Sequence, residues 1–586
     1  MDALRTLLRE VKEYKRISLV TPVFIILEVV VETLIPLLMA TIIDKGINQG
    51  SMPVIVRTGT IMLLLALAGL FTGIMGGVCG SKASAGFGKN LRKAMYNNIQ
   101  TFSFANIDKF SPSGLVTRLT TDVTNVQNAY MMILRMFVRA PISLITAMVM
   151  AFIINARIAR IYLIAVICLA VFIALLMSRT TKYFRMVFEK YDALNESVEE
   201  NVGAIRVVKA YVREEFEMNK FEKAALNIYR LFCKAESNVI LMMPVMTFTV
   251  YTVILLISWT GANMIVNSEL TTGELMSLLS YCMYILMSLM MLSIVFVMIM
   301  MSSASAQRIA EVINEESTLK NPPQPVYEVK DGSIDFDQVD FSYRQESKEM
   351  ALTNINLHIR SGETIGIIGG TGSSKSTLVN LISRLYDATK GTVRVGGRDV
   401  REYDLETLRN EVAVVLQQNV LFSGTILDNL RWGKKDATPE ECRQAAVMAC
   451  ADDFIESFPD GYDTMISQGG TNVSGGQKQR LCIARALLKD PKILILDDST
   501  SAVDTATDAR IRAAMASAKP GMTKIIITQR IVSVENADRV IVMDNGVVSG
   551  FDTPENLLKN NHIYREVYET QKEGSGDFDI SEGGKS

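Results

Sequence analysis

The sequence has very little histidine, no paired cysteine motif and almost no net charge. Its 586 residues include two histidines, which leaves little material for a histidine-based metal site or catalytic triad. The seven cysteines show no Cys-x-x-Cys spacing, so neither a zinc site nor a disulfide framework is expected. Sixty Lys+Arg against 62 Asp+Glu give a formal charge of −2, and no nucleic-acid partner is expected from such a balance.

Hydrophobic residues are abundant, and they are unevenly distributed. They make up 49% of the chain, and the mean hydropathy is +0.23. Long apolar runs lie between residues 17 and 301, whereas the sequence beyond residue 320 has the pattern of a soluble α/β domain. Because single domains usually close at about 100–200 residues, we expect a membrane-embedded part and a separate soluble part.

Six segments are long and apolar enough to span a bilayer as helices. The hydrocarbon core is about 30 Å thick and requires about 20 apolar helical residues. The predicted spans are 17–43, 54–80, 131–155, 158–178, 240–266 and 273–301. Residues 1–16 alternate leucine with charge at helical spacing, which predicts a helix lying on the membrane surface. The connections 81–130 and 179–237 are rich in Lys and Arg, so both termini are expected on the cytoplasmic side.

The domain boundaries follow from these segments and from one proline-rich break. Helical patterning continues through both long connections, which predicts that the membrane helices extend well into the cytoplasm. Pro322, Pro323 and Pro325 mark a linker, and the final residues are polar. The predicted divisions are a surface helix at 1–16, an all-α six-helix transmembrane domain at 17–317, a linker at 318–330, an α/β domain at 331–570 and a disordered tail at 571–586.

A glycine- and serine-rich loop in the soluble half has the context of a phosphate-binding loop. The apolar run ETIGIIGG precedes it and an amphipathic helix follows, which is the strand–loop–helix order of an α/β P-loop domain. Its backbone N–H groups would cradle phosphates, with Lys375 reaching the β- and γ-phosphates and the Ser376 hydroxyl binding Mg²⁺. Ser374 replaces the consensus glycine and is expected to have a negative φ. The predicted nucleotide-binding residues of the loop are Gly369, Gly370, Thr371, Gly372, Ser373, Ser374, Lys375, Ser376 and Thr377.

Further short motifs accompany this loop in a characteristic order. The apolar run KILIL ends at Asp497, a candidate second Mg²⁺ ligand at a strand end, and NVSGGQKQR lies between the two motifs. Together they resemble the ATP-binding cassette (ABC) family, and specifically its exporter half-transporters, with six spans before one cassette. The resemblance implies that Tyr343 stacks on adenine, and that Gln417 senses Mg²⁺ and contacts the membrane domain. It also implies a signature motif that binds the γ-phosphate of a partner subunit's nucleotide, formed by Ser474, Gly475, Gly476 and Gln477. The implied D-loop consists of Ser501, Ala502, Val503 and Asp504.

Two positions depart from the family pattern, and both belong to the same catalytic step. The family usually has glutamate after the strand-end aspartate, where it polarises the attacking water, and this chain has Asp498. One methylene less withdraws the carboxylate by about an ångström, enough to spoil general-base geometry. The family's switch-loop histidine is replaced by Gln529, which can donate a hydrogen bond but cannot carry the charge of a protonated histidine. Neutral drift is one interpretation, and a pocket that holds ATP but hydrolyses it poorly is the other.

The resemblance and its departures together predict ATP-driven export by one half of a heterodimer. ATP and Mg²⁺ are the implied cofactors, with Asp498, Gln529 and Gln417 as the catalytic positions of a weakly hydrolytic ABC-type ATPase site. The stretches 111–123 and 204–217 are expected to dock on the cassettes. The expected partners are a second ABC half-transporter, membrane lipids and hydrophobic or amphipathic cargo of the multidrug type. The expected location is the cytoplasmic membrane, with the cassette inside the cell. A lipid-like or peptide exporter, and a nucleotide-gated channel or regulatory subunit, are the alternatives.

Two features of the predicted spans have more than one interpretation. Glu28 and Glu32 lie mid-span at i and i+4, and hence on one helix face. Because intramembrane carboxylates are costly, they would attract cationic amphipaths, face a wet helix surface or pair with a basic residue such as Arg135 or Arg139. The sixth span is rich in methionine, and it would line an adaptable drug surface or pack against lipid and neighbouring helices.

Overall fold

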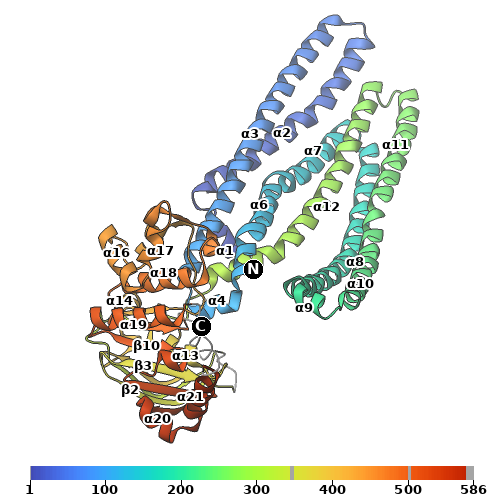
Figure 1. Ribbon diagram of the computed structural model, residues 1–586. Helices are drawn as coiled ribbons and strands as arrows, with labels where there is room; N and C mark the ends of the chain where they lie inside the picture. The colour runs from blue at the N-terminus through green and yellow to red at the C-terminus, as the bar shows by residue number, and fades with distance from the viewer. Residues whose placement is uncertain (1, 344–348, 499–502, 576–586) are drawn as a thin grey trace. The chain divides into compact units, whose positions relative to one another are not determined.

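The computed structural model of the chain contains two compact units (Figure 1). The structure describes residues 2–343, 349–498 and 503–575. The first unit comprises Met1–Gln100 and Pro112–Glu315, and the second comprises Thr101–Ser111 and Glu316–Ser586.

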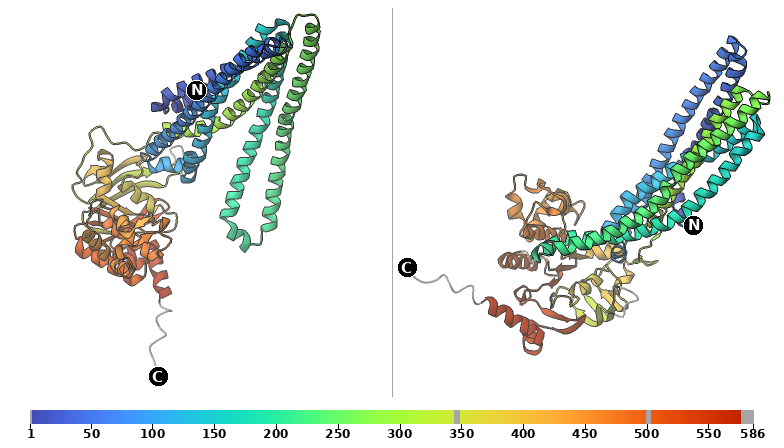
Figure 2. Two further views of the ribbon diagram at one scale, coloured as in Figure 1. Left: turned by 90° about the horizontal axis from the view of Figure 1, so that it is seen from above. Right: turned by 90° about the vertical axis from the view of Figure 1, so that its right-hand side faces the viewer.

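The first unit is helical and has six segments long and apolar enough to cross a membrane. Each predicted span falls on one of these six segments, so the predicted number of spans is confirmed. The long helices are α2 (Lys15–Thr41), α3 (Met52–Ile99), α6 (Val123–Met132), α7 (Val138–Ile154), α8 (Ala156–Gly203), α10 (Glu214–Ile240), α11 (Met242–Val266) and α12 (Thr272–Asn314). The short helices and turns are α1 (Asp2–Arg9), η1 (Lys12–Tyr14), η2 (Ile42–Ile47), α5 (Pro112–Thr117), η3 (Arg118–Asp122), η4 (Ile133–Phe137) and α9 (Ile205–Ala210). Helices α8 and α10 continue side by side to a tip formed by α9 (Figure 2).

The helices of the first unit pack through apolar faces that include a few buried hydroxyl groups. The Tyr162 hydroxyl of α8 donates to the Leu278 carbonyl of α12 at 2.6 Å. The Tyr281 hydroxyl of α12 donates to the Thr33 carbonyl of α2 at 2.7 Å. Both tyrosine rings are fully buried. These bonds satisfy polar groups that would be costly without a partner in an apolar environment.

A six-stranded sheet lies at the centre of the second unit, in the order β12-β11-β3-β10-β9-β6. Its strands pair in parallel except for β12, which is antiparallel to β11. The central strands β9 and β10 are buried along their whole length, as expected of a parallel sheet covered on both faces. A second sheet has the antiparallel order β2-β1-β4-β5, and β7 pairs with β8. The predicted fold class, a helical part with six candidate spans followed by an α/β domain, is confirmed.

The second unit has the following elements in chain order. Its strands are β1 (Ile334–Phe341), β2 (Leu352–Ile359), β3 (Thr364–Gly369), β4 (Lys390–Val395), β5 (Arg398–Asp399), β6 (Val412–Val415), β7 (Gly424–Thr425), β8 (Met465–Ile466), β9 (Ile493–Asp497), β10 (Thr523–Ile527), β11 (Arg539–Asp544) and β12 (Val547–Asp552). Its helices are α4 (Phe104–Phe110), α13 (Lys375–Ile382), α14 (Leu405–Glu411), α15 (Ile426–Arg431), α16 (Pro439–Met448), α17 (Asp452–Glu456), α18 (Gly475–Leu487), α19 (Thr505–Ala518), α20 (Pro554–Asn560) and α21 (His562–Ser575). Single turns are η5 (Val400–Glu402), η6 (Gly461–Asp463), η7 (Gln468–Gly470) and η8 (Ile531–Ser533).

One short segment of the second unit comes from between two helices of the first. Residues 101–111, which contain α4, belong to the second unit, whereas α3 and α5 on either side belong to the first. The Tyr386 hydroxyl donates to the Asp108 carboxylate of α4 at 2.8 Å. Of the predicted docking stretch 111–123, only Ser111 belongs to the second unit, and residues 112–123 continue in the first through α5 and η3 to the start of α6. Docking of this stretch on a cassette stays a prediction.

The C-terminal helix α21 extends past residue 571, where the tail is predicted to begin. It runs to Ser575, and residues 576–586 lie outside the described residues.

Candidate nucleotide-binding site

The predicted phosphate loop connects a buried strand to a helix N-terminus. Strand β3, paired with β10 and β11, ends at Gly369, and α13 begins at Lys375. A Cβ on Gly369 would lie 2.3 Å from the Met543 carbonyl oxygen, so only glycine fits where the loop leaves the sheet. The loop thus lies at the carboxyl edge of a parallel sheet, where open α/β folds bind ligands.

Ser374 has the opposite backbone conformation from the one expected. Its φ is +70° and its ψ is +28°, in the left-handed region. The expectation of a negative φ is wrong, because the residue turns the loop into α13 and glycine would normally make that turn without a Cβ penalty. Among the described residues, the Ser374 hydroxyl caps no N–H group of α13.

Lys375 lies folded over the phosphate loop. Its Nζ donates to the carbonyls of Gly369 and Gly370 at 2.8 and 2.7 Å. Burial lowers the pKa of Lys375, and the nearby carboxylates of Asp497 and Asp498 oppose that shift. The ammonium group is therefore already positioned at the loop that would hold phosphates.

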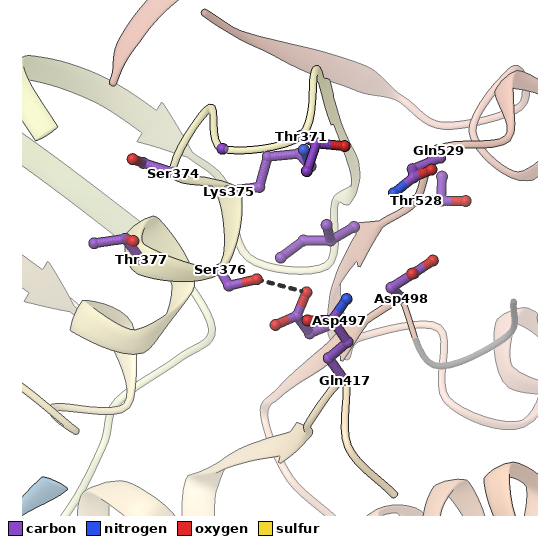
Figure 3. A pocket seen from close by; sticks show the side chains of 12 residues that line it. Thr371, Ser374, Lys375, Ser376, Thr377, Gln417, Asp497, Asp498, Thr528 and Gln529 are labelled. Carbon is purple, nitrogen blue, oxygen red and sulfur yellow. Dashed lines mark hydrogen bonds between the residues drawn. The ribbon is translucent and has the colours of Figure 1, made fainter. Parts of the chain in front are cut away.

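The two predicted Mg²⁺ ligands with short side chains are in direct contact. The Ser376 hydroxyl donates to the Asp497 carboxylate at 3.0 Å (Figure 3). Asp497 ends the buried strand β9, and burial raises its pKa, with a smaller contribution from Asp498 and with the Ser376 hydrogen bond opposing. Gln417, which follows the neighbouring strand β6, lines the same cavity as Ser376 and Asp497. These oxygen donors suit Mg²⁺, which takes few protein ligands and completes its shell with phosphate and water oxygens.

The loop and the strand ends enclose one cavity of about 290 Å³. Asp498 and Gln529, the two positions that depart from the family pattern, both line it and lie on the same side of it (Figure 3). Burial raises the pKa of Asp498, whereas the charges of Arg530 and Lys375 lower it. The lining residues are Thr371, Gly372, Ser374, Lys375, Ser376, Thr377, Gln417, Asp497, Asp498, Ile527, Thr528 and Gln529.

Tyr343 lies beside this cavity in a small aromatic group. Its hydroxyl and the Thr377 hydroxyl are 2.9 Å apart, and its ring is half exposed. It meets the Tyr386 ring edge-on, with the centroids 5.3 Å apart, and Tyr386 in turn contacts Phe104 of α4 at 6.0 Å. Tyr386 was not predicted from the sequence, because its contacts are with α4, a segment nearly 280 residues earlier that meets it only in the fold.

The signature residues form a capped helix N-terminus away from the cavity lining. The Ser474 N–H donates to Gln477 Oε1 at 2.9 Å, and the Gln477 N–H donates to the Ser474 hydroxyl at 3.3 Å, a capping box at the start of α18. Residues 474–477 are absent from the described residues that line the cavity. Of the predicted D-loop, Ser501 and Ala502 lie outside the described residues, and Asp504 caps α19.

Glu28 and Glu32 of α2 share one arginine. Arg139 of α7 donates to Glu28 Oε1 at 2.8 Å and to Glu32 Oε2 at 2.6 Å. Of the alternatives open from the sequence, pairing with a basic residue is therefore the one found, and the partner is Arg139 rather than Arg135.

The chain matches two family profiles in order. Residues 19–290 match the ABC transporter transmembrane region, and residues 352–501 match the ABC transporter family. It is 34% identical over 566 residues to the uncharacterized ABC transporter ATP-binding protein YfiB of Bacillus subtilis, covering 96% of this chain and 98% of that one. It is 36% identical over 574 residues to the uncharacterized ABC transporter ATP-binding protein Rv1273c of Mycobacterium tuberculosis, covering 97% and 98%.

The fold also matches a solved structure. A bacterial Atm1-family ABC exporter with ATP bound superimposes with a TM-score of 0.82 at 22% identity, covering 95% of this chain and 99% of that one. At that identity the likeness concerns the fold. The curated relatives and the family profiles show that the chain belongs to the ABC transporters, as a multi-pass membrane protein with its transmembrane and nucleotide-binding domains on one polypeptide.

Proposed function

We propose that this chain is one half of a heterodimeric, ATP-driven exporter whose own site binds ATP and hydrolyses it slowly. The observation that carries this proposal is the joint position of Asp498 and Gln529 in the cavity formed by Lys375 and Asp497 (Figure 3). The groups suited to phosphate and Mg²⁺ are retained, and the altered groups are those that would act on water and the γ-phosphate.

The backbone around Asp498 supports slow hydrolysis. Asp498 directly follows β9, which is paired on both sides by β10 and β6, and its N–H donates to the Ile527 carbonyl at 3.0 Å. A strand held in this way cannot shift toward the cavity to compensate for the methylene that Asp498 lacks relative to glutamate. A water-positioning group displaced by about an ångström loses much of its effect, and Gln529 supplies hydrogen bonds without charge.

ATP with Mg²⁺ is the ligand that the cavity fits. The N–H groups of the first turn of α13 and the Lys375 ammonium offer positive potential to phosphates. Ser376, Asp497 and Gln417 offer oxygens to the metal, which when bound would neutralise phosphate charge. The described residues include no cluster of three or more His, Cys, Asp or Glu that could hold a metal, which is in keeping with an ion held mainly by phosphates and water.

The signature residues support a second subunit. Ser474 and Gly475 are exposed at the N-terminus of α18, and first-turn N–H groups are suited to bind phosphate. Their place outside this chain's cavity fits a role at a partner's nucleotide. Two copies of this chain would combine two altered sites, whereas a partner with glutamate and histidine at the two positions would provide one competent site.

The transmembrane half supports export across the cytoplasmic membrane. The excess of Lys and Arg in 81–130 and 179–237 favours a cytoplasmic nucleotide-binding domain, with 204–217 as a second docking region. The apolar and methionine-rich helices favour hydrophobic or amphipathic cargo of the multidrug type.

Nucleotide trapping in the assembled pair tests the proposal. With labelled, photoreactive ATP and Mg²⁺, we expect a slowly exchanging nucleotide that cross-links to this chain, and a rapidly exchanging one at the partner's site. Lys375→Ala should remove the slow label alone. Equal turnover at both sites would rule out the asymmetry.

A further inference from the structure

The switch loop after β10 is held by a side chain from the C-terminal helix. The Gln571 Nε2 donates to the Gln529 carbonyl at 2.6 Å, and the Ile531 N–H donates to Gln571 Oε1 at 2.8 Å. One side-chain amide thus satisfies an acceptor and a donor on the two sides of Arg530. A primary amide is suited to this task because it carries a neutral donor and a neutral acceptor in one plane.

Gln571 is exposed and lies on α21 one turn beyond the residues of its packed face. Tyr564, Val567 and Tyr568 belong to or pack against the core cluster that contains Ile531. The spacing from 564 through 567 and 568 to 571 places these four residues on one side of a helix. Gln571 is therefore a polar residue at the end of an apolar stripe, and its position is set by the packing of the helix.

The start of α21 is fixed to the sheet. The Tyr564 N–H donates to Asn561 Oδ1 at 3.0 Å, and the Asn561 Nδ2 donates to the Ser549 carbonyl of β12 at 3.2 Å. Since β12 pairs with β11 in the central sheet, α21 is attached to the same sheet that carries the switch loop at the end of β10.

The peptide between Gln529 and Arg530 is held at both of its edges. The Arg530 N–H donates to the Thr528 hydroxyl at 3.0 Å, and the Arg530 guanidinium donates to the Val503 carbonyl at 3.1 Å. The Arg530 N–H belongs to the same peptide as the Gln529 carbonyl, so the Thr528 hydroxyl holds one edge of that peptide, and the guanidinium bond orients the Arg530 side chain. The bond from Gln571 holds the opposite, carbonyl edge of this peptide, next to the Gln529 side chain.

We propose that Gln571 is a positioning residue that sets the direction of the Gln529 side chain in the nucleotide cavity. The inference rests on the proposed function in one respect, namely that the cavity takes the γ-phosphate of ATP. With the backbone held on both sides of Arg530, the Gln529 side chain lines the cavity near Asp498 (Figure 3). Without Gln571 the carbonyl edge of this peptide is released and the peptide tilts about its remaining bond to Thr528. The Gln529 side chain then loses its direction, so ATP loses a contact that ADP, without a γ-phosphate, does not use.

Amide hydrogen exchange of the complete transporter tests whether Gln571 holds the switch loop, whether or not the site hydrolyses ATP. In Gln571→Ala, peptides spanning 529–534 should exchange about fivefold faster, as expected for the loss of one hydrogen bond. Gln571→Glu keeps an acceptor for Ile531 but turns a carboxylate toward the Gln529 carbonyl, and should also accelerate exchange. Glu569→Ala, on the exposed side of the same helix, is the matched control. Unchanged exchange in Gln571→Ala overturns the proposal.

The preference of this chain's site for ATP over ADP separates positioning from general stability. Competition of unlabelled ATP and ADP, each with Mg²⁺, against the photoreactive label should show that Gln571→Ala lowers the preference about three- to tenfold. The same change on a Gln529→Ala background should have no further effect, because its action passes through Gln529. Additive effects overturn the proposal. Fast hydrolysis at this site would instead refute the proposed function and leave the exchange result standing.

Discussion

Ser374 carries a side chain at a position whose backbone is left-handed. A non-glycine residue in this region costs about 1–2 kcal/mol, and the hydroxyl offers no compensating cap to α13 within the described residues. The strain lies at the mouth of the cavity, where the loop must hold its N–H groups toward phosphate. Local strain of this kind is tolerated at functional sites when the surrounding structure maintains it.

Ser374→Gly is therefore expected to stabilise the nucleotide-binding domain. Relief of the left-handed strain exceeds the extra chain entropy of glycine, for a net gain of about 0.5–1 kcal/mol. The measurement is the temperature at which the purified transporter loses binding of labelled ATP. Ser374→Ala removes the hydroxyl but keeps the Cβ, so it should give no gain. An equal gain in both variants would assign the effect to the hydroxyl.

Glu28, Glu32 and Arg139 form one charged group between α2 and α7. Because Arg139 bonds both Glu28 and Glu32, replacing both carboxylates by glutamine should leave a guanidinium without a charged partner between the helices. We expect lower expression and a loss of transport that is similar for cationic and neutral dyes. Adding Arg139→Met should restore expression. A loss confined to cationic dyes would show that the carboxylates serve cargo instead.

Helix α4 is part of the nucleotide-binding unit, although its neighbours in sequence, α3 and α5, belong to the transmembrane unit. Its Asn106 donates to the Glu316 carbonyl at 3.1 Å, and its Asp108 accepts from Tyr386. Tyr386 also meets Tyr343, which contacts Thr377 at the cavity. A continuous series of contacts therefore runs from the phosphate loop to a segment that is covalently continuous with α3 and α5.

Tyr386→Phe tests whether this series couples nucleotide binding to transport. The variant keeps the ring contacts and removes the hydrogen bond to Asp108, so ATP binding should be unchanged. Transport per ATP hydrolysed by the pair should fall about two- to fivefold, the effect of one hydrogen bond. Tyr327→Phe, which removes an exposed hydroxyl in the linker, is the control. No additional loss should follow from Asp108→Asn in the Tyr386→Phe background, and full additivity would contradict the coupling.

The proposed heterodimer separates what this chain does at its own site from what it provides to a partner. Asp498 and Gln529 line its own cavity, whereas Gly475 and Gln477 stand at an exposed helix N-terminus outside that cavity. The proposed heterodimer assigns slow turnover to the first pair and an essential contact to the second. The two kinds of variant should therefore differ strongly in the assembled transporter.

Gly475→Glu should nearly abolish ATPase activity and transport of the pair, and Asp498→Asn should reduce ATPase activity only modestly. A bulky acidic side chain at Gly475 keeps the cassettes apart at the competent site, and a lost transition-state contact costs about 10²–10³ in rate. Steady-state ATPase activity of both variants beside the unaltered pair, in one membrane preparation, makes the comparison. Equal damage from the two would show that the slow site is not in this chain.

Features that depend on covalent neighbours could be predicted without the fold. Six apolar segments, a strand–loop–helix phosphate loop and the strand-end Asp497 are contiguous patterns, and each was found where it was predicted. Hydropathy and loop chemistry act over a few residues, so they are visible without the fold.

Features that join distant segments or depend on backbone geometry became visible only in the folded chain. The left-handed φ of Ser374, the choice of Arg139, the place of residues 101–111 in the second unit and the bonds of Gln571 were not predicted. The sequence offered neighbouring alternatives that local patterns do not distinguish. Arg135 and Arg139 lie one helical turn apart, and residues 101–111 adjoin 111–123. Only the packing of helices and sheet selects among them, because a hydrogen bond or ion pair requires a particular distance and direction between groups that the chain brings together from far apart.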